Sequence, residues 1–325
     1  MNPICRLTRV VVAAWLLVVA SVSTAQEPAY PSKPIRIIYP YAAGGSAALL
    51  AQLLAEQLRK SWGQTALAEA RPGGNTTIGS EAVANAAPDG YTLLLQNSAH
   101  VINPSLLKTP YDAVNDFVPV ATLVSTDYLM TVHPGVTANT LQEFIALAKA
   151  KPTALNYGST GNGSVTHLLA ELFNITAGIK TKHVPYKGSS PALADLMGGH
   201  IQMYFSPPDV TAALIKSGKL RALAITGASR FSELPQVPTF AQAGLPNYSV
   251  AIWFGVLAPK GTPRPLVDKL SAEIARILAL ADVKSSLQSR GFSPFISTPD
   301  QFATMVKADI ATFAQVIKTA GIKAD

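Results

Sequence analysis

The sequence lacks the residues that disulfide, thiolate, metal and nucleic-acid chemistry require. Its single cysteine, Cys5, lies ahead of an apolar run, and its five histidines are scattered without H-x-x-x-H or H-x-E spacing. A disulfide, a catalytic thiolate and a metal centre are therefore not expected. Charged residues form only 14% of the chain, and basic residues gather no further than pairs such as Arg59 and Lys60. Because nucleic-acid binding needs a clustered basic surface, we expect no nucleic-acid partner. We also expect no cofactor.

The first 25 residues have the pattern of a secretory signal peptide. Arg6 and Arg9 precede an apolar run at residues 10–19, and small residues follow near Ala25. The run is shorter than the roughly 20 residues that cross a bilayer. We expect cleavage near Ala25, which lowers the net charge from +7 to +5 and leaves about 300 residues, enough for two domains. The mature protein is expected to be exported.

Apolar runs alternate with helical patterns in two stretches of the chain. Residues 33–123 read as a βαβαβ unit, and residues 141–206 repeat the alternation of helix and strand. Such an order predicts parallel sheets covered by helices, here in two α/β lobes. A further strand at residues 249–259 precedes a helical tail, whose last helix begins with a capping box between Thr298 and Gln301.

The stretch YPYAAGGSAALL, residues 39–50, runs from a strand through two glycines and Ser46 into a helix. A nucleophile elbow, G-x-S-x-G, is absent, because Gly45 directly precedes the serine. The spacings G-x-x-x-x-G-K-[ST] and G-x-G-x-x-G are also absent, which disfavours ATP and NAD. An exported serine hydrolase that pairs Ser46 or Ser164 with a histidine remains as an alternative.

The same stretch has what an anion site needs. A helix that starts near Ser46 leaves backbone N–H groups unpaired, and its dipole favours negative charge there. A second strand, turn and helix, at residues 154–171, repeats this layout with glycine, serine, threonine and asparagine in the turn. We predict that the two turns face each other across a cleft and close on an anion. A third polar turn at residues 96–105 carries Asn97 and His100 at another strand end.

Several stretches together resemble the Bug family, the periplasmic solute-binding receptors associated with tripartite tricarboxylate transporters. They follow one another along nearly the whole chain: YPSKPIRIIYPYAAGGS, RPGGNTTIGSEAVANAAPDGYTLLL, INPSL with PYDAVNDFVPVA, LNYGSTGNGSVTHLLAELF, HVPYKGSSPALADLMGGHI, SGKLRALAIT, LPQVPTFAQAGLPNY and WFGVLAPKGTP.

The resemblance implies a type II periplasmic-binding-protein fold, with two α/β lobes joined by two crossing hinge segments around the ligand. By analogy, lobe I takes residues 26–124 and 238–325, and lobe II takes residues 125–237. It further implies a monomeric, non-enzymatic receptor that delivers a small organic carboxylate to the membrane permease subunits of a tripartite tricarboxylate transporter. An orphan receptor that signals through a partner without a dedicated permease is the other alternative.

The resemblance also implies that two turns hold the ligand carboxylate, and the sequence suggests further contacts. A mono- or dicarboxylate is expected, and the aromatic residues Tyr41, Phe205 and Trp253 favour an aromatic acid. The expected contacts are Tyr41, Ala42, Gly44, Gly45 and Ser46 from the first turn, Ser159, Gly161, Asn162, Gly163 and Ser164 from the second, and Asn97, His100, His167, Ser206, Asp209 and Trp253 as further candidates.

The chain departs from the family pattern at both glycine-rich loops near its start. The family's first turn commonly reads P-x-A-P-G-G-S-x-D, whereas Ala43 and Ala48 stand here at the second proline and the acid. The loop after Arg71 carries larger residues at positions 75–77. We therefore expect the first turn to bind a carboxylate mainly through its backbone N–H groups.

Overall fold

A computed structural model describes residues 30–152, 154–248, 250, 252–320 and 322. The predicted signal peptide, residues 1–25, lies outside the described residues. The chain divides into a short unit, Met1–Ser32, and a large unit, Lys33–Asp325, and the architecture below is that of the large unit. Within the described part of the chain, no helix combines the length and the apolar character needed to cross a membrane.

The first sheet begins with the predicted βαβαβ unit. Strand β1 (Ile35–Tyr39) pairs in parallel with β2 (Ala66–Ala70) and with β3 (Thr92–Asn97). Helices α2 (Ser46–Trp62) and α3 (Thr77–Ala84) connect these strands. The apolar residues of β1 are buried because helices cover both faces of a parallel sheet. The prediction for this part of the chain is confirmed.

The rest of the first sheet differs from the expected parallel arrangement. Strand β10 (Ile252–Pro259) lies antiparallel between β3 and β4 (Phe117–Thr126), and β11 (Phe292–Pro294) forms the edge beside β4. The strand order is β11-β4-β10-β3-β1-β2, so the sheet is mixed. All eight residues of β10 are buried, and a wholly buried strand has no alternating pattern from which to infer its partners.

The second sheet contains the five strands between the two crossings of the chain. Its order is β7-β6-β8-β5-β9, with β6 parallel to both neighbours and β5 antiparallel to both of its own. The strands are β5 (Leu129–Val132), β6 (Asn156–Ser159), β7 (Lys182–Pro185), β8 (Met203–Ser206) and β9 (Arg221–Ile225). The helices are α5 (Leu141–Ala150), α6 (Val165–Ala177), α7 (Ser189–Met197) and α8 (Pro208–Lys216).

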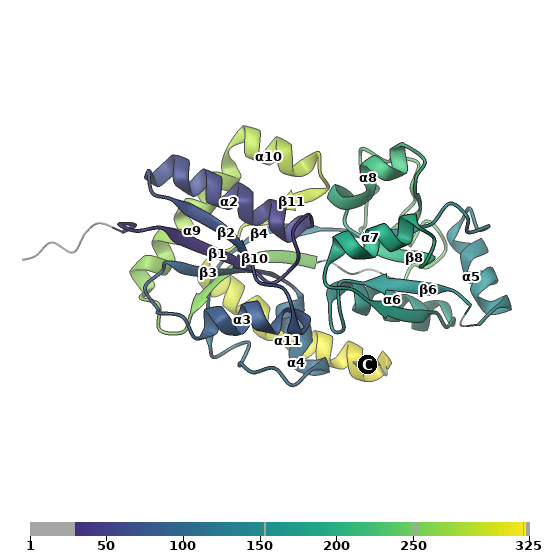
Figure 1. Ribbon diagram of the computed structural model, residues 1–325, viewed down its shortest axis with the longest axis horizontal. Helices are drawn as coiled ribbons and strands as arrows, with labels where there is room; N and C mark the ends of the chain where they lie inside the picture. Colours follow the sequence, from purple (N-terminus) through teal and green to yellow (C-terminus); the bar gives the residue numbers. More distant parts are fainter. Residues whose placement is uncertain (1–29, 153, 249, 251, 321, 323–325) are drawn as a thin grey trace, which may run out of the picture. The chain divides into compact units, whose positions relative to one another are not determined.

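We call the first sheet with its helices lobe I and the second sheet with its helices lobe II. The remaining helices of lobe I are α4 (Ala99–Leu106), α9 (Arg264–Ala279), α10 (Ala281–Gln288) and α11 (Pro299–Ala320). In Figure 1, α2 and α10 lie above the first sheet, and α3, α4 and α11 lie below it.

The lobe boundaries predicted at residues 124 and 238 stay predictions. The chain passes from the first sheet to the second between Thr126 and Leu129, and it returns between Ile225 and Ile252. Phe240 and Tyr248, in the returning segment, pack in the core of lobe II. We propose to place the second boundary after Tyr248.

The last helix begins as predicted. The backbone N–H of Gln301 donates to Thr298 Oγ1 at 3.2 Å, and the backbone N–H of Thr298 donates to Gln301 Oε1 at 2.9 Å. This reciprocal pair is a capping box. Phe302 and Val306 on the apolar face of α11 are buried against Trp253 in the core of lobe I.

The segment expected to be a third polar turn is instead mostly helix. Asn97 ends β3, and α4 starts two residues later, at Ala99. The apolar residues Ala99, Val101 and Ile102 are fully buried, and α4 packs on α11. Polar residues and Pro104 around them mask this short buried helix in the sequence.

Candidate functional site

A small cavity of about 30 Å³ lies where the two lobes meet. It brings together the first turn (Tyr41–Ser46), the second turn (Ser159–Ser164) and the start of α7. Its lining consists of Tyr41, Ala42, Gly45, Ser46, Ala47, Asn97, Tyr128, Thr160, Val165, Thr166, Ser189, Pro207 and Phe254.

Four helices begin at this cavity. Helices α2, α6, α7 and α8 contribute Ser46, Val165, Ser189 and the N-cap residue Pro207 to its wall. Among the described residues, no side chain caps the amino end of α2 or α7, whereas the Asp209 carboxyl accepts from backbone N–H groups in the first turn of α8. Unpaired N–H groups and the helix dipole make each such end partly positive. None of the described lining residues is basic, so the attraction of the cavity for an anion comes from backbone.

Glycine and serine let the first turn approach lobe II closely. Gly44 has a φ of +90°, and a Cβ atom there would lie 2.7 Å from Ser190 Oγ. The Ser190 hydroxyl donates to the Ala43 carbonyl oxygen at 2.9 Å. The Ser46 hydroxyl donates to Asp209 Oδ1, also at 2.9 Å. Two hydrogen bonds therefore join the first turn to α7 and α8.

Tyr41 and Asn97 are predicted site residues that line the cavity in fixed positions. Tyr41 Oη lies 2.6 Å from Gln96 Oε1 and 2.7 Å from Asn97 Oδ1, so its hydroxyl donates to one of two amide oxygens. The Ala99 backbone N–H also donates to Asn97 Oδ1, at 2.9 Å. Burial raises the pKa of Tyr41 well above its ordinary value, so the phenol stays a neutral donor.

The second turn is held by its own polar side chains. Ser164 caps α6, because its Oγ accepts from the His167 backbone N–H at 3.3 Å. Thr166 Oγ1 accepts from the Thr160 backbone N–H at 2.8 Å. Ser159 Oγ lies 2.6 Å from His183 Nε2. These interactions lie within lobe II, and Thr160 alone of this turn lines the cavity. Five predicted contacts of this turn, Ser159, Gly161, Asn162, Gly163 and Ser164, do not.

The glycines of the second turn lie against lobe I. A Cβ atom on Gly161 would lie 3.3 Å from Asn75 Oδ1, and one on Gly163 would lie 3.0 Å from Asn103 Oδ1. Asn75 and Thr76 have φ values of 53° and 75°, a left-handed conformation that a β-branched residue such as threonine rarely adopts. The Asn103 amide donates to Thr76 Oγ1 at 3.0 Å. The loop after Arg71 thus faces the second turn and does not line the cavity.

The other polar candidates lie around the cavity without lining it. The Ser206 hydroxyl pairs with Thr211 Oγ1 at 2.8 Å. His167 Nδ1 accepts from the Gly163 backbone N–H at 3.1 Å, and its ring stacks on His183 at 4.2 Å between centroids. Gly44 and Asp209 line a separate groove, of about 650 Å³, on the outer side of the first turn.

His100 is part of the core of lobe I. Its Nε2 donates to the Ala113 carbonyl oxygen at 2.8 Å, and its ring packs edge-on against Phe117 at 4.9 Å between centroids. Burial lowers its pKa to about 4, so the ring is neutral at pH 7. His100 thus packs in the core and does not line this cavity, and its expected donation to a ligand stays a prediction.

The aromatic wall of the cavity differs from the expected one. Tyr41 lines it, whereas Phe205 lies in the core of lobe II and Trp253 packs on α11 with its Nε1 donating to Asp309 Oδ2 at 2.8 Å. Phe254 lines the cavity in place of Trp253. Neighbouring residues of a strand point to opposite faces, so an error of one residue moved the prediction to the wrong face.

The remaining wall residues were missed in the sequence. Ser189 follows Gly188 at the start of α7, which repeats the glycine-serine-helix layout and offers a readable signal. Thr166 follows the Ser164 cap by two residues. Tyr128 lies in the chain crossing between the sheets, and no local pattern marks it.

The described residues of the cavity do not pair a serine with a histidine. Ser46 donates to a carboxylate, and Ser164 serves as a helix cap. The histidine beside a serine is His183, but its partner Ser159 is fully buried and lies outside the cavity lining. No group of metal-binding side chains occurs among the residues that the structure describes. The arrangement is suited to holding a ligand.

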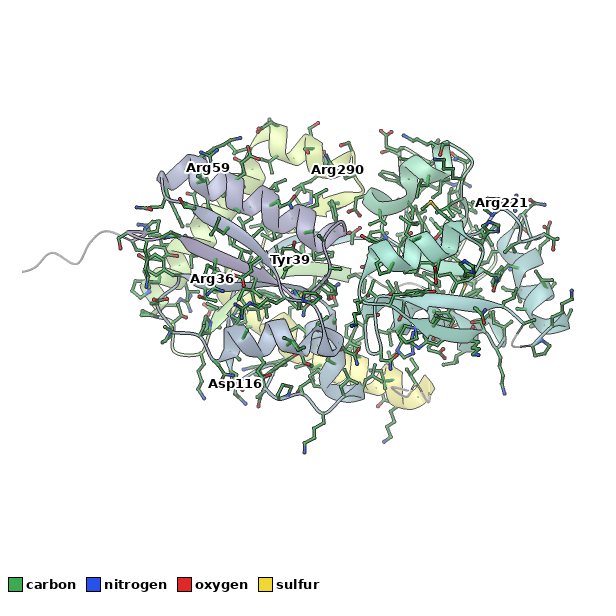
Figure 2. All side chains as sticks on the ribbon, in the orientation of Figure 1. Arg36, Tyr39, Arg59, Asp116, Arg221 and Arg290 are labelled. Carbon is green, nitrogen blue, oxygen red and sulfur yellow. The ribbon has the colours of Figure 1, made fainter. Side chains whose placement is uncertain are left out.

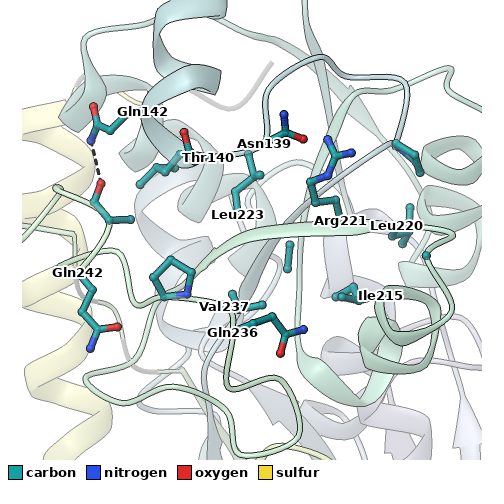
Figure 3. Close-up of a pocket in the computed structure, with 16 residues that line it drawn as sticks. Asn139, Thr140, Gln142, Ile215, Leu220, Arg221, Leu223, Gln236, Val237 and Gln242 are labelled. Atoms are coloured by element: carbon teal, nitrogen blue, oxygen red, sulfur yellow. Dashed lines mark hydrogen bonds between the residues drawn. The ribbon is translucent and has the colours of Figure 1, made fainter.

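A larger hollow of about 760 Å³ lies on lobe II (Figure 3). It is bounded by β9 and residues 236–243. Arg221, on its wall, donates to the carbonyl oxygens of Val136 and Ala138 at 3.1 and 3.0 Å. All of its lining comes from residues 134–243, so a ligand there would not join the two lobes.

Comparisons with known proteins agree on one family. A family model described as "Tripartite tricarboxylate transporter family receptor" matches residues 50–322. The chain is 36% identical to Protein BugT of Bordetella pertussis over 297 residues, which cover 90% of this chain and 91% of BugT. Its fold matches that of Rpa4515 of R. palustris with adipate, with a TM-score of 0.87, 33% identity and coverage of 90% and 99% of the two chains. MatC from Rhodopseudomonas palustris with bound malate matches with a TM-score of 0.85, 30% identity and coverage of 89% and 100%.

Proposed function

Because this chain belongs to the family of tripartite tricarboxylate transporter receptors, we propose that it captures a small organic carboxylate between its lobes. The cavity of about 30 Å³ has room for little more than a water molecule, so the lobes must part when the ligand enters. The observation that carries the proposal is the meeting of two uncapped helix ends, those of α2 and α7, at a cavity whose described lining contains no basic side chain. Backbone N–H groups at helix ends bind carboxylates without a salt bridge.

The ligand class is a mono- or dicarboxylate. Two similar proteins support this choice, since the structure of Rpa4515 is one with adipate and that of MatC is one with bound malate. A carboxylate at the start of α2 meets the backbone of Gly45 and Ser46, with the polar groups of Tyr41 and Asn97 on the same wall. The aromatic ring of Phe254 adds an apolar surface, which also suits an aromatic acid.

The wider role is that of a periplasmic receptor for a transporter. We propose that the signal peptide, residues 1–25, is removed on export and that the monomeric receptor delivers its ligand to membrane permease subunits. The protein acts by binding and not by catalysis, since Ser46 donates its hydrogen bond to Asp209 and Ser164 caps the amino end of α6. An orphan receptor that signals through another protein would use the same cavity.

A thermal-shift screen tests the ligand class. Malate, adipate, succinate and benzoate are compared with glucose and a divalent cation as controls. A ligand at 100 times its dissociation constant stabilises the fold by about 2.7 kcal/mol. A shift with glucose or the cation, and with none of the carboxylates, would overturn the proposal.

A serine-directed phosphonate tests the hydrolase alternative. The receptor proposal expects no stoichiometric adduct at Ser46 or Ser164, because Ser46 donates to the Asp209 carboxylate and Ser164 caps α6, so neither forms the serine–histidine pair of the hydrolase alternative. Mass spectrometry that finds one of these serines labelled would favour the hydrolase.

A further inference from the structure

Asp209 lies on the opposite lobe from the first turn and accepts a hydrogen bond from it. It is the second residue of α8, and its Oδ1 accepts from Ser46 Oγ at 2.9 Å although 163 residues separate the two in sequence. Ser46 lines the cavity, and Asp209 lines the groove on the other side of the same turn. Ser46 therefore lies between the carboxylate of Asp209 and the place proposed for the ligand.

Whether Ser46 can donate a hydrogen bond to a ligand depends on the protonation state of Asp209. A serine hydroxyl has one donor hydrogen and two acceptor lone pairs. While Asp209 is ionised it accepts that hydrogen, which leaves Ser46 without a hydrogen for a second anion. A protonated Asp209 can donate to Ser46 Oγ instead, and Ser46 can then donate into the cavity. Hydrogen bonds that follow one another in this way strengthen each other in a site of low polarity.

Both acidic and basic groups surround Asp209, and together they offset its negative charge only in part. Gly291, one residue after Arg290, lies close to Pro208 at the start of α8, and Figure 2 shows Arg290 at the end of α10 beside that helix. Arg290 and the phenols of Tyr128 and Tyr204 interact with Asp209 through their charges. Farther along the same groove lie Glu56 and Lys60 from α2 and Asp282 from α10.

Burial dominates the titration of this carboxyl. It raises the pKa of Asp209 to about 7, although the hydrogen bond from Ser46 and the charge of Arg290 each act to lower it. Both protonation states are therefore populated near neutral pH. No histidine lines the cavity or the groove among the described residues.

We propose that Asp209 couples ligand capture to proton uptake: a carboxylate that accepts the hydrogen of Ser46 binds together with one proton, which Asp209 takes up and donates to Ser46. The inference rests on the proposed function. It makes Asp209 a specificity-determining residue, because an ionised Asp209 disfavours an anion beside Ser46 and a protonated one favours it.

The expected pH dependence follows from linkage. A ligand that accepts the hydrogen of Ser46 removes that hydrogen bond from the Asp209 carboxylate, which raises the pKa of the carboxyl, so the complex holds more protons than the free protein. Affinity should therefore fall as pH rises above about 7, by about tenfold per pH unit while one proton is taken up per ligand. Malate and adipate are suitable probes because their own carboxyl groups are already ionised there.

Isothermal titration calorimetry in Tris and HEPES, at about pH 6.5, 7.5 and 8.5, measures the affinity and the number of protons taken up. The wild-type protein should take up about one proton per ligand at the highest pH. Asp209→Asn should abolish the uptake and bind about tenfold more tightly than wild type there, since its amide can donate to Ser46. Ser46→Ala should bind more weakly at every pH and take up no proton. Asp282→Asn, in the same groove, should keep the wild-type uptake.

The outcomes separate this inference from the proposed function. Binding without proton uptake, or uptake that persists in Asp209→Asn, would overturn the role of Asp209 and leave the receptor intact. If Asp209→Asn fails to fold, loss of uptake in Ser46→Ala with uptake retained in Asp282→Asn supports the relay, and the same uptake in both contradicts it. No heat with either probe at any pH, together with no carboxylate response in the thermal screen, would overturn both proposals.

Discussion

The two glycine-serine turns look alike in sequence, yet the two lobes use them differently. In the first turn, Gly45 precedes α2 and supplies no side-chain cap, so the first backbone N–H groups of α2 stay available at the cavity. In the second turn, Ser164 caps α6, and Thr166 holds the backbone of Thr160. A glycine-rich turn before a helix is thus open to an anion only where its serine does not satisfy the helix itself.

The glycines of the two turns have a common feature, which is contact with the opposite lobe. Gly44 lies against Ser190 of lobe II, and Gly163 lies against Asn103 of lobe I. Each needs a left-handed backbone as well as space. The first turn therefore combines contact with lobe II and an uncapped helix start at the cavity, whereas the second turn mainly shapes the wall.

The largest effect is expected from Gly44→Ala. The new Cβ meets Ser190 Oγ and the left-handed backbone costs alanine about 1–2 kcal/mol. We expect affinity for malate or adipate to fall at least about tenfold by calorimetry, which corresponds to about 1.4 kcal/mol. Gly63→Ala is the matched control, because Gly63 has a φ of +69° with open space around it. It should lower stability and leave affinity unchanged. Equal affinity losses in the two variants would show that the first turn has no special role.

Ser164→Ala should act on stability instead. Loss of the α6 cap costs about 1 kcal/mol of unfolding free energy, measured by urea denaturation. Thr140→Ala removes the cap of α5, where Thr140 Oγ1 accepts from the Glu143 backbone N–H at 3.2 Å, and should cost a similar amount. Affinity should stay within about twofold of wild type in both. A tenfold loss of affinity in Ser164→Ala alone would mean that the second turn binds the ligand directly.

Thr166→Val tests whether ligand affinity depends on the hydrogen bond that holds the second turn at the cavity wall. Valine keeps the shape but leaves the backbone N–H of Thr160 without its acceptor, so affinity should fall about fivefold, or about 1 kcal/mol. Thr176→Val, in the same helix, removes a hydroxyl that donates to the Leu172 carbonyl oxygen at 2.7 Å. That control should bind as wild type, and an equal loss in both would assign the effect to α6 as a whole.

Much of the fold could be predicted because it follows from local sequence patterns. The βαβαβ opening and the capping box at Thr298 depend on spacing and side-chain chemistry within a few residues. The antiparallel insertion of β10 could not be predicted, since a fully buried strand carries no pattern that identifies its neighbours. The first turn could be proposed as an anion site because a helix start is also local.

The cavity wall was predicted less well, because it depends on orientation and on pairs of distant residues. Trp253 and Phe254 are adjacent, and which of them faces the cavity follows from the register of β10. Asp209 was a candidate contact, but its bond to Ser46 exists only once the lobes are packed. Serines that cap a helix and serines that face a ligand have the same neighbours in sequence.

The smallest effect is expected from Ser190→Ala, which tests whether the first turn depends on its contact with α7. The change removes the hydrogen bond to the Ala43 carbonyl oxygen, an exposed bond worth about 0.5 kcal/mol, so affinity should fall about twofold. Ser217→Ala removes another exposed serine bond, to the Leu214 carbonyl oxygen at 3.1 Å, and should leave affinity unchanged. Combining Ser190→Ala with Gly44→Ala sharpens the comparison further. The methyl group that Gly44→Ala adds meets the hydroxyl that Ser190→Ala deletes, so the double variant should recover part of the affinity lost in Gly44→Ala. Strictly additive losses would instead place the whole effect of Gly44→Ala in backbone strain.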